Sequence, residues 1–347
     1  MTALFCRNFT LPYHSFSFLY PRLVAPGAPL RVSWGLSARQ RIVSARTILL
    51  LLALLGSLAA CSGGTADNAQ TSALPAAAPV SLSAASAQPA QTKAPKYVFL
   101  FIGDGMSYPQ IQSTADYLGA LADEDYLNAQ PSLDDNQGAI LDGPEYLNFM
   151  NFEAAGSAVT FDSNSFAPDS ASTATSISTG HKTYSGTINM DETGSVSYET
   201  ISEKLKDQLG WKIGVISSVN LNHATPAAFY AHQQSRGSYY EIGLELVDSG
   251  FEYFAGGGLL KPTGSDKDKE SLYDLAEKAG YNVVTTQAEA EKVTSGPVIL
   301  IDENLADSSA MAYELDRTDA MWSLADYVEK GIEVLDNDKG FFMMCEG

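Results

Sequence analysis

Four short apolar runs without alternating polar residues constrain the fold of this 347-residue chain more than any other feature. They cover residues 97–102, 213–216, 298–301 and 341–344. Continuous hydrophobicity of this length is typical of strands buried on both faces of a sheet. Helical patterns fall between or beside the runs, at residues 198–208, 239–247, 270–279 and 320–335. The alternation predicts an α/β fold with a doubly wound, largely parallel central sheet and helices on both faces.

The first 60 residues have the features of an export signal. An apolar run at 48–55 follows Arg41 and Arg46 and ends in small residues, as in a secretory signal peptide. Residues 58–61, Leu-Ala-Ala-Cys, are similar to a bacterial lipobox, which predicts lipidation of Cys61. An ordinary cleavage site that precedes a cysteine is the alternative.

The predicted organisation has three parts. Residues 1–60 are the signal region, of which 1–40 indicate a start codon assigned too early. Residues 61–95 are a lipidated cysteine and an Ala/Ser/Pro-rich linker that cannot bury a core. Residues 96–347 are the globular domain. Because Ser62 follows the cysteine, we expect an outer-membrane lipoprotein facing the periplasm, or a periplasmic or extracellular protein if it is not lipidated.

The charge of the chain is strongly negative. The formal net charge is −20, and all 41 acidic side chains lie beyond residue 60. Nucleic-acid binding depends on Lys and Arg that neutralise phosphates, so this composition argues against it. A phosphate-handling site in such a field requires metal ions to reverse the local charge.

The sequence Ala-Pro-Asp-Ser-Ala-Ser-Thr-Ala-Thr at 167–175 indicates a catalytic serine. Ser170 follows Asp169 and precedes only small residues, so its hydroxyl is expected at a helix N-terminus, which favours anions. A serine hydroxyl is a weak nucleophile at neutral pH and requires a base or a metal. The alternative is a plain helix start with Asp169 or Ser170 as the N-cap.

Two carboxylates fall at predicted strand ends, where ligands bind in open α/β sheets. Asp104 follows the first run between two glycines, and Glu346 follows the last run. Both are suitable ligands for a hard cation. On its own, Gly-Asp-Gly at 103–105 is also typical of a plain turn. Cys345 is expected to be a small buried residue.

The segment from His223 to Arg236 adds two further candidates. Thr225 precedes a proline, so we expect it in extended backbone with its hydroxyl available to Mg²⁺. Arg236 has the fork geometry to hold two oxygens of a phosphate. A helix cap for Thr225 and a solvated surface charge for Arg236 are the alternatives.

Together these motifs resemble the alkaline phosphatase family in residue type and order. They are Gly-Asp-Gly-Met at 103–106, Asp-Ser-Ala-Ser-Thr-Ala-Thr at 169–175, Ser-Thr-Gly-His-Lys-Thr at 178–183, His-Ala-Thr-Pro-Ala-Ala at 223–228 and Glu-Gly at 346–347. The resemblance implies a hydrolase of small phosphomonoesters with two Zn²⁺, one Mg²⁺ and a phosphoseryl intermediate, in a family that is commonly dimeric.

The resemblance also implies catalytic roles. Ser170 is the nucleophile, whose alkoxide one zinc stabilises. Arg236 binds the phosphoryl group, and Asp169 orients that arginine. His232 belongs to the motif without an assigned role.

For the metals, the resemblance implies that Asp104 is shared between one zinc and the magnesium. Thr225 and Glu346 would bind the magnesium, and His223 would tune that site.

The sequence departs from the family in its zinc ligands. In the family these are Asp and His residues beyond the Glu-Gly segment, and none of the four histidines here matches one. We therefore expect a C-terminally truncated piece of a longer protein, with an incomplete sheet, poor zinc binding and little or no phosphatase activity.

Two other functions stay open. A sulfatase or phosphodiesterase of the same superfamily fits less well, because sulfatases use Cys/Ser-x-Pro-x-Arg and diesterases generally use threonine. A non-catalytic lipoprotein that binds phosphate or a metal would keep Arg236, but it would not require Asp104, Ser170, Thr225 and Glu346 together.

Overall fold

The computed structural model describes residues 2–6, 94–123 and 142–347. The chain divides into two units, Met1–Leu11 with Lys93–Gly347, and Pro12–Thr92. The second unit lies outside the described residues, so the signal peptide, the lipidation of Cys61 and the linker stay predictions. In the part that is described, no helix combines the length and apolarity needed to cross a bilayer.

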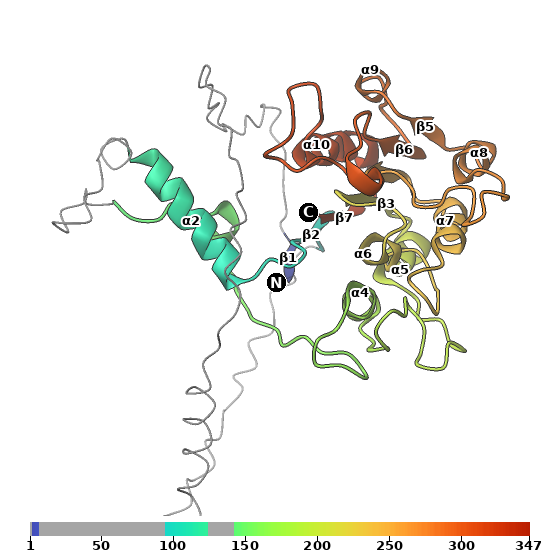
Figure 1. Cartoon of the computed structure of the whole chain (residues 1–347), viewed down its shortest axis with the longest axis horizontal. Helices are drawn as coiled ribbons and strands as arrows, with labels where there is room; N and C mark the ends of the chain where they lie inside the picture. Colours follow the sequence, from blue (N-terminus) through green and yellow to red (C-terminus); the bar gives the residue numbers. More distant parts are fainter. Residues whose placement is uncertain (1, 7–93, 124–141) are drawn as a thin grey trace, which may run out of the picture. The chain divides into compact units, whose positions relative to one another are not determined.

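A parallel sheet forms the centre of the first unit (Figure 1). Among the described residues, its seven strands lie in the order β1-β2-β7-β3-β4-β6-β5, and only β1 runs antiparallel to its neighbour. The strands are β1 (Thr2–Cys6), β2 (Tyr97–Ile102), β3 (Lys212–Ser217), β4 (Tyr253–Gly256), β5 (Asn282–Val284), β6 (Val298–Ile301) and β7 (Phe341–Glu346). The largely parallel sheet expected from the sequence is confirmed.

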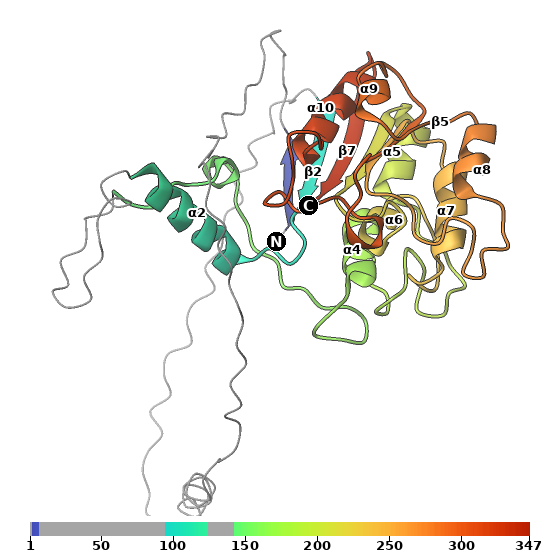
Figure 2. The ribbon, with the colours of Figure 1, turned by 45° about the horizontal axis from the view of Figure 1, so that its top comes forward.

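Helices cover both faces of this sheet, as Figure 2 shows. One face carries α4 (Ser170–Thr179), α5 (Ile201–Leu209), α6 (Ala224–Ala227), α7 (Tyr239–Asp248) and α8 (Leu272–Lys278). The other carries α9 (Gln287–Ala290) and α10 (Leu324–Leu335). The remaining helices in the described ranges are α2 (Tyr108–Ala122), η1 (Asn148–Asn151) and η2 (Asp307–Ser309). The doubly wound architecture is therefore confirmed.

Strand β7 shows why the apolar runs are continuous. Phe342 and Met344 contribute to the core under α4–α8, whereas Met343 and Cys345 contribute to the core under α9 and α10. Every residue of this strand is buried. A strand with a core on each side needs apolar side chains at successive positions. The prediction that Cys345 is buried is confirmed.

Helix starts differ from the prediction because capping residues define them. The patterns at 198–208 and 320–335 begin as helices only at Ile201 and Leu324. Thr200 and Ser323 form capping boxes at these points, with Glu203 and Asp326 as the reciprocal partners. A capping box satisfies N–H groups that would otherwise be unpaired, and it therefore decides where the helix begins.

Strands β4 and β5 are absent from the sequence prediction, as is β1, which lies within the predicted signal region. β4 has four residues and leads directly into the glycines at 256–258, and β5 has three. Runs this short carry too little periodicity to be distinguished from loops.

The carboxyl ends of three strands meet at one place. In the register of the sheet, Glu346 at the end of β7 pairs with Ile102 of β2 and with Ser217 of β3. The Asp104 N–H donates to the Gly347 carbonyl at 3.0 Å. The sheet therefore brings Asp104 beside Glu346, although the two are far apart in the sequence.

Candidate active site

The N-terminus of α4 is organised by Asp169. Asp169 is the N-cap, and Ser170 is the first residue of the helix. The Asp169 carboxylate accepts hydrogen bonds from the N–H of Ser172 at 3.1 Å and of Gly186 at 3.0 Å. Asp169 is therefore the helix cap of the alternative interpretation, and Ser170 lies in the first turn, where an anion is favoured. The catalytic role of Ser170 stays a prediction.

The second oxygen of Asp169 binds Arg236. The Arg236 Nη1 group donates to Asp169 Oδ2 at 2.8 Å, and the Arg236 N–H donates to the Gly186 carbonyl at 2.7 Å. Burial disfavours the charge of Asp169, but hydrogen bonds from Gly186 and Arg236 outweigh it and lower the pKa of this carboxyl. Arg236 is thus a half-buried cation that the N-cap residue of α4 holds in place.

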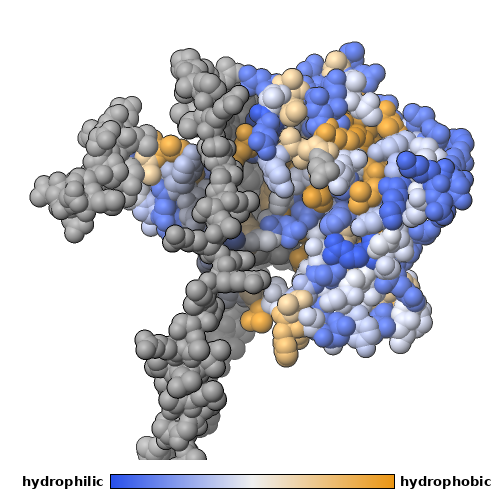
Figure 3. All heavy atoms as spheres, viewed as in Figure 1, coloured by the Kyte–Doolittle hydropathy of each residue, from blue (hydrophilic) through white to orange (hydrophobic). Residues whose placement is uncertain are grey.

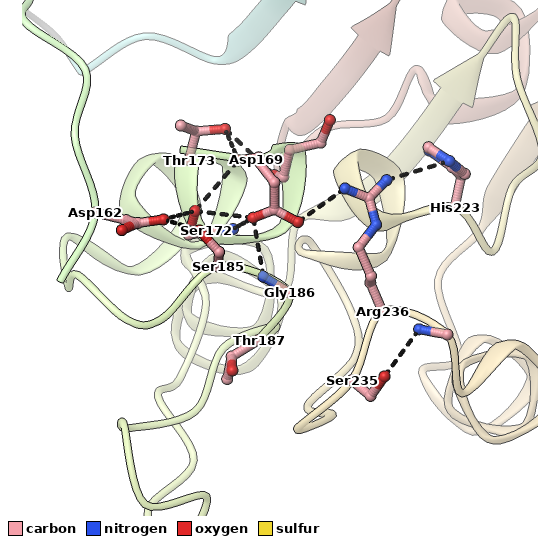
Figure 4. A network of polar contacts seen from close by, with 12 residues as sticks. Asp162, Asp169, Ser172, Thr173, Ser185, Gly186, Thr187, His223, Ser235 and Arg236 are labelled. Atoms are coloured by element: carbon pink, nitrogen blue, oxygen red, sulfur yellow. Dashed lines mark hydrogen bonds and ion pairs between the residues drawn. The ribbon is translucent and has the colours of Figure 1, made fainter. Parts of the chain in front are cut away.

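His223 lies on the other side of the guanidinium (Figure 4). Its Nε2 atom is 3.3 Å from Arg236 Nη2. Because arginine only donates, this nitrogen must accept, which places the proton of the neutral ring on Nδ1. Burial, together with the Arg236 charge, lowers the pKa of His223 and keeps the ring neutral.

Glu346 lies at the centre of the polar groups at the strand ends. It is 2% exposed, and its Oε2 atom accepts from the Ser217 hydroxyl at 2.7 Å. The Thr225 hydroxyl lies near this carboxylate and favours its charged form. Burial raises the pKa of Glu346, and the nearby Asp104 charge acts in the same direction. The structure therefore brings together Asp104, Thr225 and Glu346, as the sequence predicted.

The expected backbone of Thr225 is wrong. Thr225 lies inside α6, and His223 is the N-cap of that helix. Pro226 is tolerated because the N–H groups of a first helical turn have no partner within the helix, so a missing N–H costs nothing there. The helical turn directs the backbone differently from the extended form, yet the Thr225 hydroxyl still reaches Glu346.

The donors at the strand ends fit magnesium better than zinc. Asp104, Thr225 and Glu346 offer only oxygen atoms, which Mg²⁺ prefers. Zinc sites are built mainly from His, Cys and carboxylates. In the described ranges, no group of three or more His, Cys, Asp or Glu side chains is placed to hold a metal ion. The zinc sites implied by the resemblance therefore do not fit the described residues.

Several site residues were missed by the sequence interpretation. Ser217 could have been found, because it ends a predicted strand in the same way as Glu346. Asp162 and Ser185 lie outside the quoted motifs, and Ser172 lies inside the motif at 169–175 but was given no role there; Figure 4 shows all three near Asp169. They are polar residues of loops and a helix turn, and only the folded chain shows what they contact.

The fold and the site define an α/β protein with an anion-attracting helix terminus backed by a fixed arginine. The sequence model described as "Alkaline phosphatase" matches residues 95–347. This chain belongs to the alkaline phosphatase family, and the resemblance seen in its motifs is confirmed.

Relatives and solved structures agree with this assignment. The chain is 30% identical to alkaline phosphatase 4 of Bacillus subtilis over 72% of this chain and 50% of that protein. It is 27% identical to the alkaline phosphatase of Escherichia coli over 74% of this chain and 60% of that protein. A variant of the TAB5 alkaline phosphatase with Mg bound in its M3 site matches with a TM-score of 0.58 and 29% identity, over 74% of this chain and 65% of that one. The chain spans about half the length of the curated relatives it matches.

Proposed function

We propose that this chain carries the nucleophile and the phosphate-binding arginine of a phosphomonoester hydrolase. The observation that supports this function best is the pairing of Ser170 at a helix N-terminus with Arg236, which Asp169 holds at 2.8 Å. The N-terminus of a helix and a fixed guanidinium both favour an anion, and together they would attract a phosphoryl group.

In the proposed first step, the Ser170 hydroxyl loses its proton to solvent water and its oxygen attacks phosphorus. The bond from Ser170 Oγ to phosphorus forms as the bond to the leaving alcohol breaks, and the alcohol oxygen takes up a proton. Water then cleaves the phosphoserine and releases inorganic phosphate. Arg236 binds the phosphoryl oxygens throughout, and Asp169 keeps the guanidinium in place.

Asp104, Thr225 and Glu346 are proposed to hold Mg²⁺. When bound, this ion supplies positive charge close to the developing negative charge of the phosphoryl group. The three oxygen donors converge from the ends of β2 and β7 and from α6, which supports the assignment. The Asp104 charge raises the pKa of Glu346, so a cation bound between them would relieve the repulsion between the two carboxylates.

A phosphate-binding protein without turnover is the second candidate. The absence of a zinc donor set among the described residues favours it. Such a protein would still need Arg236, but it would not form a covalent bond at Ser170.

Trapping of phosphoserine separates the two candidates. The protein at the full length of its curated relatives is incubated with a phosphomonoester, Mg²⁺ and Zn²⁺, quenched in acid and digested, and the peptide that contains Ser170 is examined by mass spectrometry. We expect phosphate on Ser170, with none in Ser170→Ala and normal labelling in Ser176→Ala, a serine of the same helix. An unlabelled Ser170 in the metal-loaded chain contradicts the hydrolase and supports the binding protein.

A further inference from the structure

Asp162 is a buried carboxylate that no motif of the family resemblance includes. It is 5% exposed. Burial of a charge costs several kcal/mol unless hydrogen bonds or an opposite charge compensate it. Among the described residues, no Lys, Arg or His forms an ion pair with it. Its charge must therefore be held by hydrogen bonds alone.

Three groups supply those hydrogen bonds. The Asn164 N–H donates to Oδ1 at 3.0 Å, and the Ser172 hydroxyl donates to Oδ2 at 2.9 Å. The Ser185 hydroxyl donates to the same Oδ2 atom. Burial opposes ionisation, but these hydrogen bonds, with Ser185 the largest, lower the pKa of Asp162, so the group is an anion at neutral pH.

Two of these donors belong to the segments that bind Asp169 (Figure 4). Ser172 donates both its N–H and its hydroxyl to Asp169, at 3.1 Å and 2.9 Å. Ser185 directly precedes Gly186, whose N–H donates to Asp169 at 3.0 Å. Asp162 thus contacts both segments that orient the Asp169 carboxylate.

Ser172 is fixed from two sides. Its hydroxyl oxygen lies 2.9 Å from a carboxylate oxygen of Asp162 and 2.9 Å from one of Asp169. A serine hydroxyl has a single proton to donate, so the two anions share it. Displacement of either carboxylate therefore disturbs the other, in the way that members of a hydrogen-bond network are coupled.

We propose that Asp162 is a positioning residue for Arg236, which it holds through Ser172, Ser185 and the Asp169 carboxylate. The Asp162 side chain does not touch Arg236 or the reacting atoms. It fixes the donors around Asp169, and Asp169 fixes the guanidinium at 2.8 Å. The role in phosphate binding rests on the function proposed above, whereas the positioning of Arg236 does not.

The direct test measures how firmly Arg236 is held. An ion pair slows rotation about the Cζ–Nη bonds, so a fixed guanidinium gives separate Nη signals in nitrogen-15 NMR of the arginine side chains. The Arg236 signals are identified by their loss in Arg236→Lys. We expect separate signals in the wild-type chain and exchange-averaged ones in Asp162→Asn.

The control variant is Asp191→Asn. Asp191 is a partly exposed carboxylate that accepts hydrogen bonds from the N–H groups of Ser195 and Val196 in its own turn. The Asp191→Asn substitution should leave the Arg236 signals unchanged. If Asp162→Asn prevents folding, Ser185→Ala replaces it, because that variant removes one donor from Asp162 and none of the direct donors to Asp169. Unchanged Arg236 signals in these variants overturn the proposal.

Phosphate affinity distinguishes this inference from the proposed function. Calorimetry measures binding of inorganic phosphate to the Mg²⁺-loaded chain. We expect Asp162→Asn to weaken binding by about tenfold, and to have no further effect in an Asp169→Asn background. If the Arg236 signals change but phosphate affinity does not, the positioning holds and the proposed role of Arg236 fails. If affinity falls while the signals stay unchanged, the positioning is wrong.

Discussion

His232 shows how a residue of a catalytic motif can serve the fold instead. Its ring lies between Glu203 of α5 and Glu245 of α7, with nitrogen–oxygen distances of 3.5 Å and 3.4 Å. The backbone N–H of His232 also donates a hydrogen bond to the Glu245 carboxylate, at 2.7 Å. Burial favours the neutral ring, but the two carboxylates outweigh it and raise the pKa of His232 to about 10. The segment that leads to Arg236 is thereby attached to two helices.

The raised pKa predicts a loss of stability at alkaline pH. An unfolded histidine loses its proton near pH 6.5, whereas folded His232 keeps it to about pH 10. Across this window the native state binds one more proton than the unfolded state, so the unfolding free energy falls as pH rises. The slope due to His232 is at most about 1.4 kcal/mol per pH unit, and it vanishes below about pH 6.

Urea unfolding at a series of pH values measures this effect. The difference in unfolding free energy between the wild type and His232→Gln should shrink between pH 7 and pH 10. His181→Gln, which changes an exposed histidine stacked on Tyr198, should run parallel to the wild type. If the unfolding free energy of His232→Gln also runs parallel to that of the wild type, the ion pairs of His232 do not cause the pH dependence.

At the level of secondary-structure elements, α10 packs against the sheet and covers the core that lies under α9 and α10. Tyr327, Val334 and Leu335 of this helix are buried in that core. Gly331 lies on the same side, where an added Cβ would come within 2.8 Å of Met343 Cε and 2.9 Å of Tyr253 Cε1. The glycine is therefore required for close packing of the helix, although glycine is a poor helix former.

The substitution Gly331→Ala tests whether the gain in helix propensity or the loss of close packing has the larger effect on stability. Alanine gains about 1 kcal/mol in helix propensity, but overpacking of a core costs about 1–3 kcal/mol. We expect a net loss of about 1 kcal/mol in unfolding free energy, measured by urea unfolding. Glu329→Gly, at an exposed position of the same helix, reports the propensity difference alone. A Gly331→Ala protein more stable than the wild type would show that the helix can move away from the sheet.

For the molecule as a whole, charge is the dominant property. The net charge is −20. On the face shown in Figure 3, hydrophilic residues cover most of the surface around α7 and α8. Surface ion pairs such as Lys269 with Glu241, at 2.8 Å, each contribute at most about 1 kcal/mol. Repulsion among the excess acidic groups acts over longer distances and destabilises the compact state.

Added salt should therefore stabilise the protein. Between about 0.01 M and 0.15 M NaCl the screening length falls from about 30 Å to about 8 Å. Screening weakens the repulsion more than it weakens the short ion pairs, so we expect Tm to rise over this range in circular dichroism. Choline chloride should have the same effect if screening is the cause. A Tm that stays constant or falls would mean that the ion pairs outweigh the net charge.

Local patterns in the amino-acid sequence were sufficient for the main elements and for the position of the proposed nucleophile at a helix start. The strands at 97–102 and 298–301 have the predicted bounds, because a strand with a core on each side must be apolar at successive positions. Asp169 and Ser170 are adjacent, so their placement at the start of α4 depends only on the local backbone.

Contacts between distant segments were decided by the tertiary structure alone. The hydrogen bond between Ser217 and Glu346 joins residues 129 positions apart, and it exists because β3 and β7 pair in one register. The attachment of Asp162 to Ser172 depends on how a loop folds back over α4. Residue types determine which groups are able to interact, but only the packing of the sheet and its helices determines which of them meet.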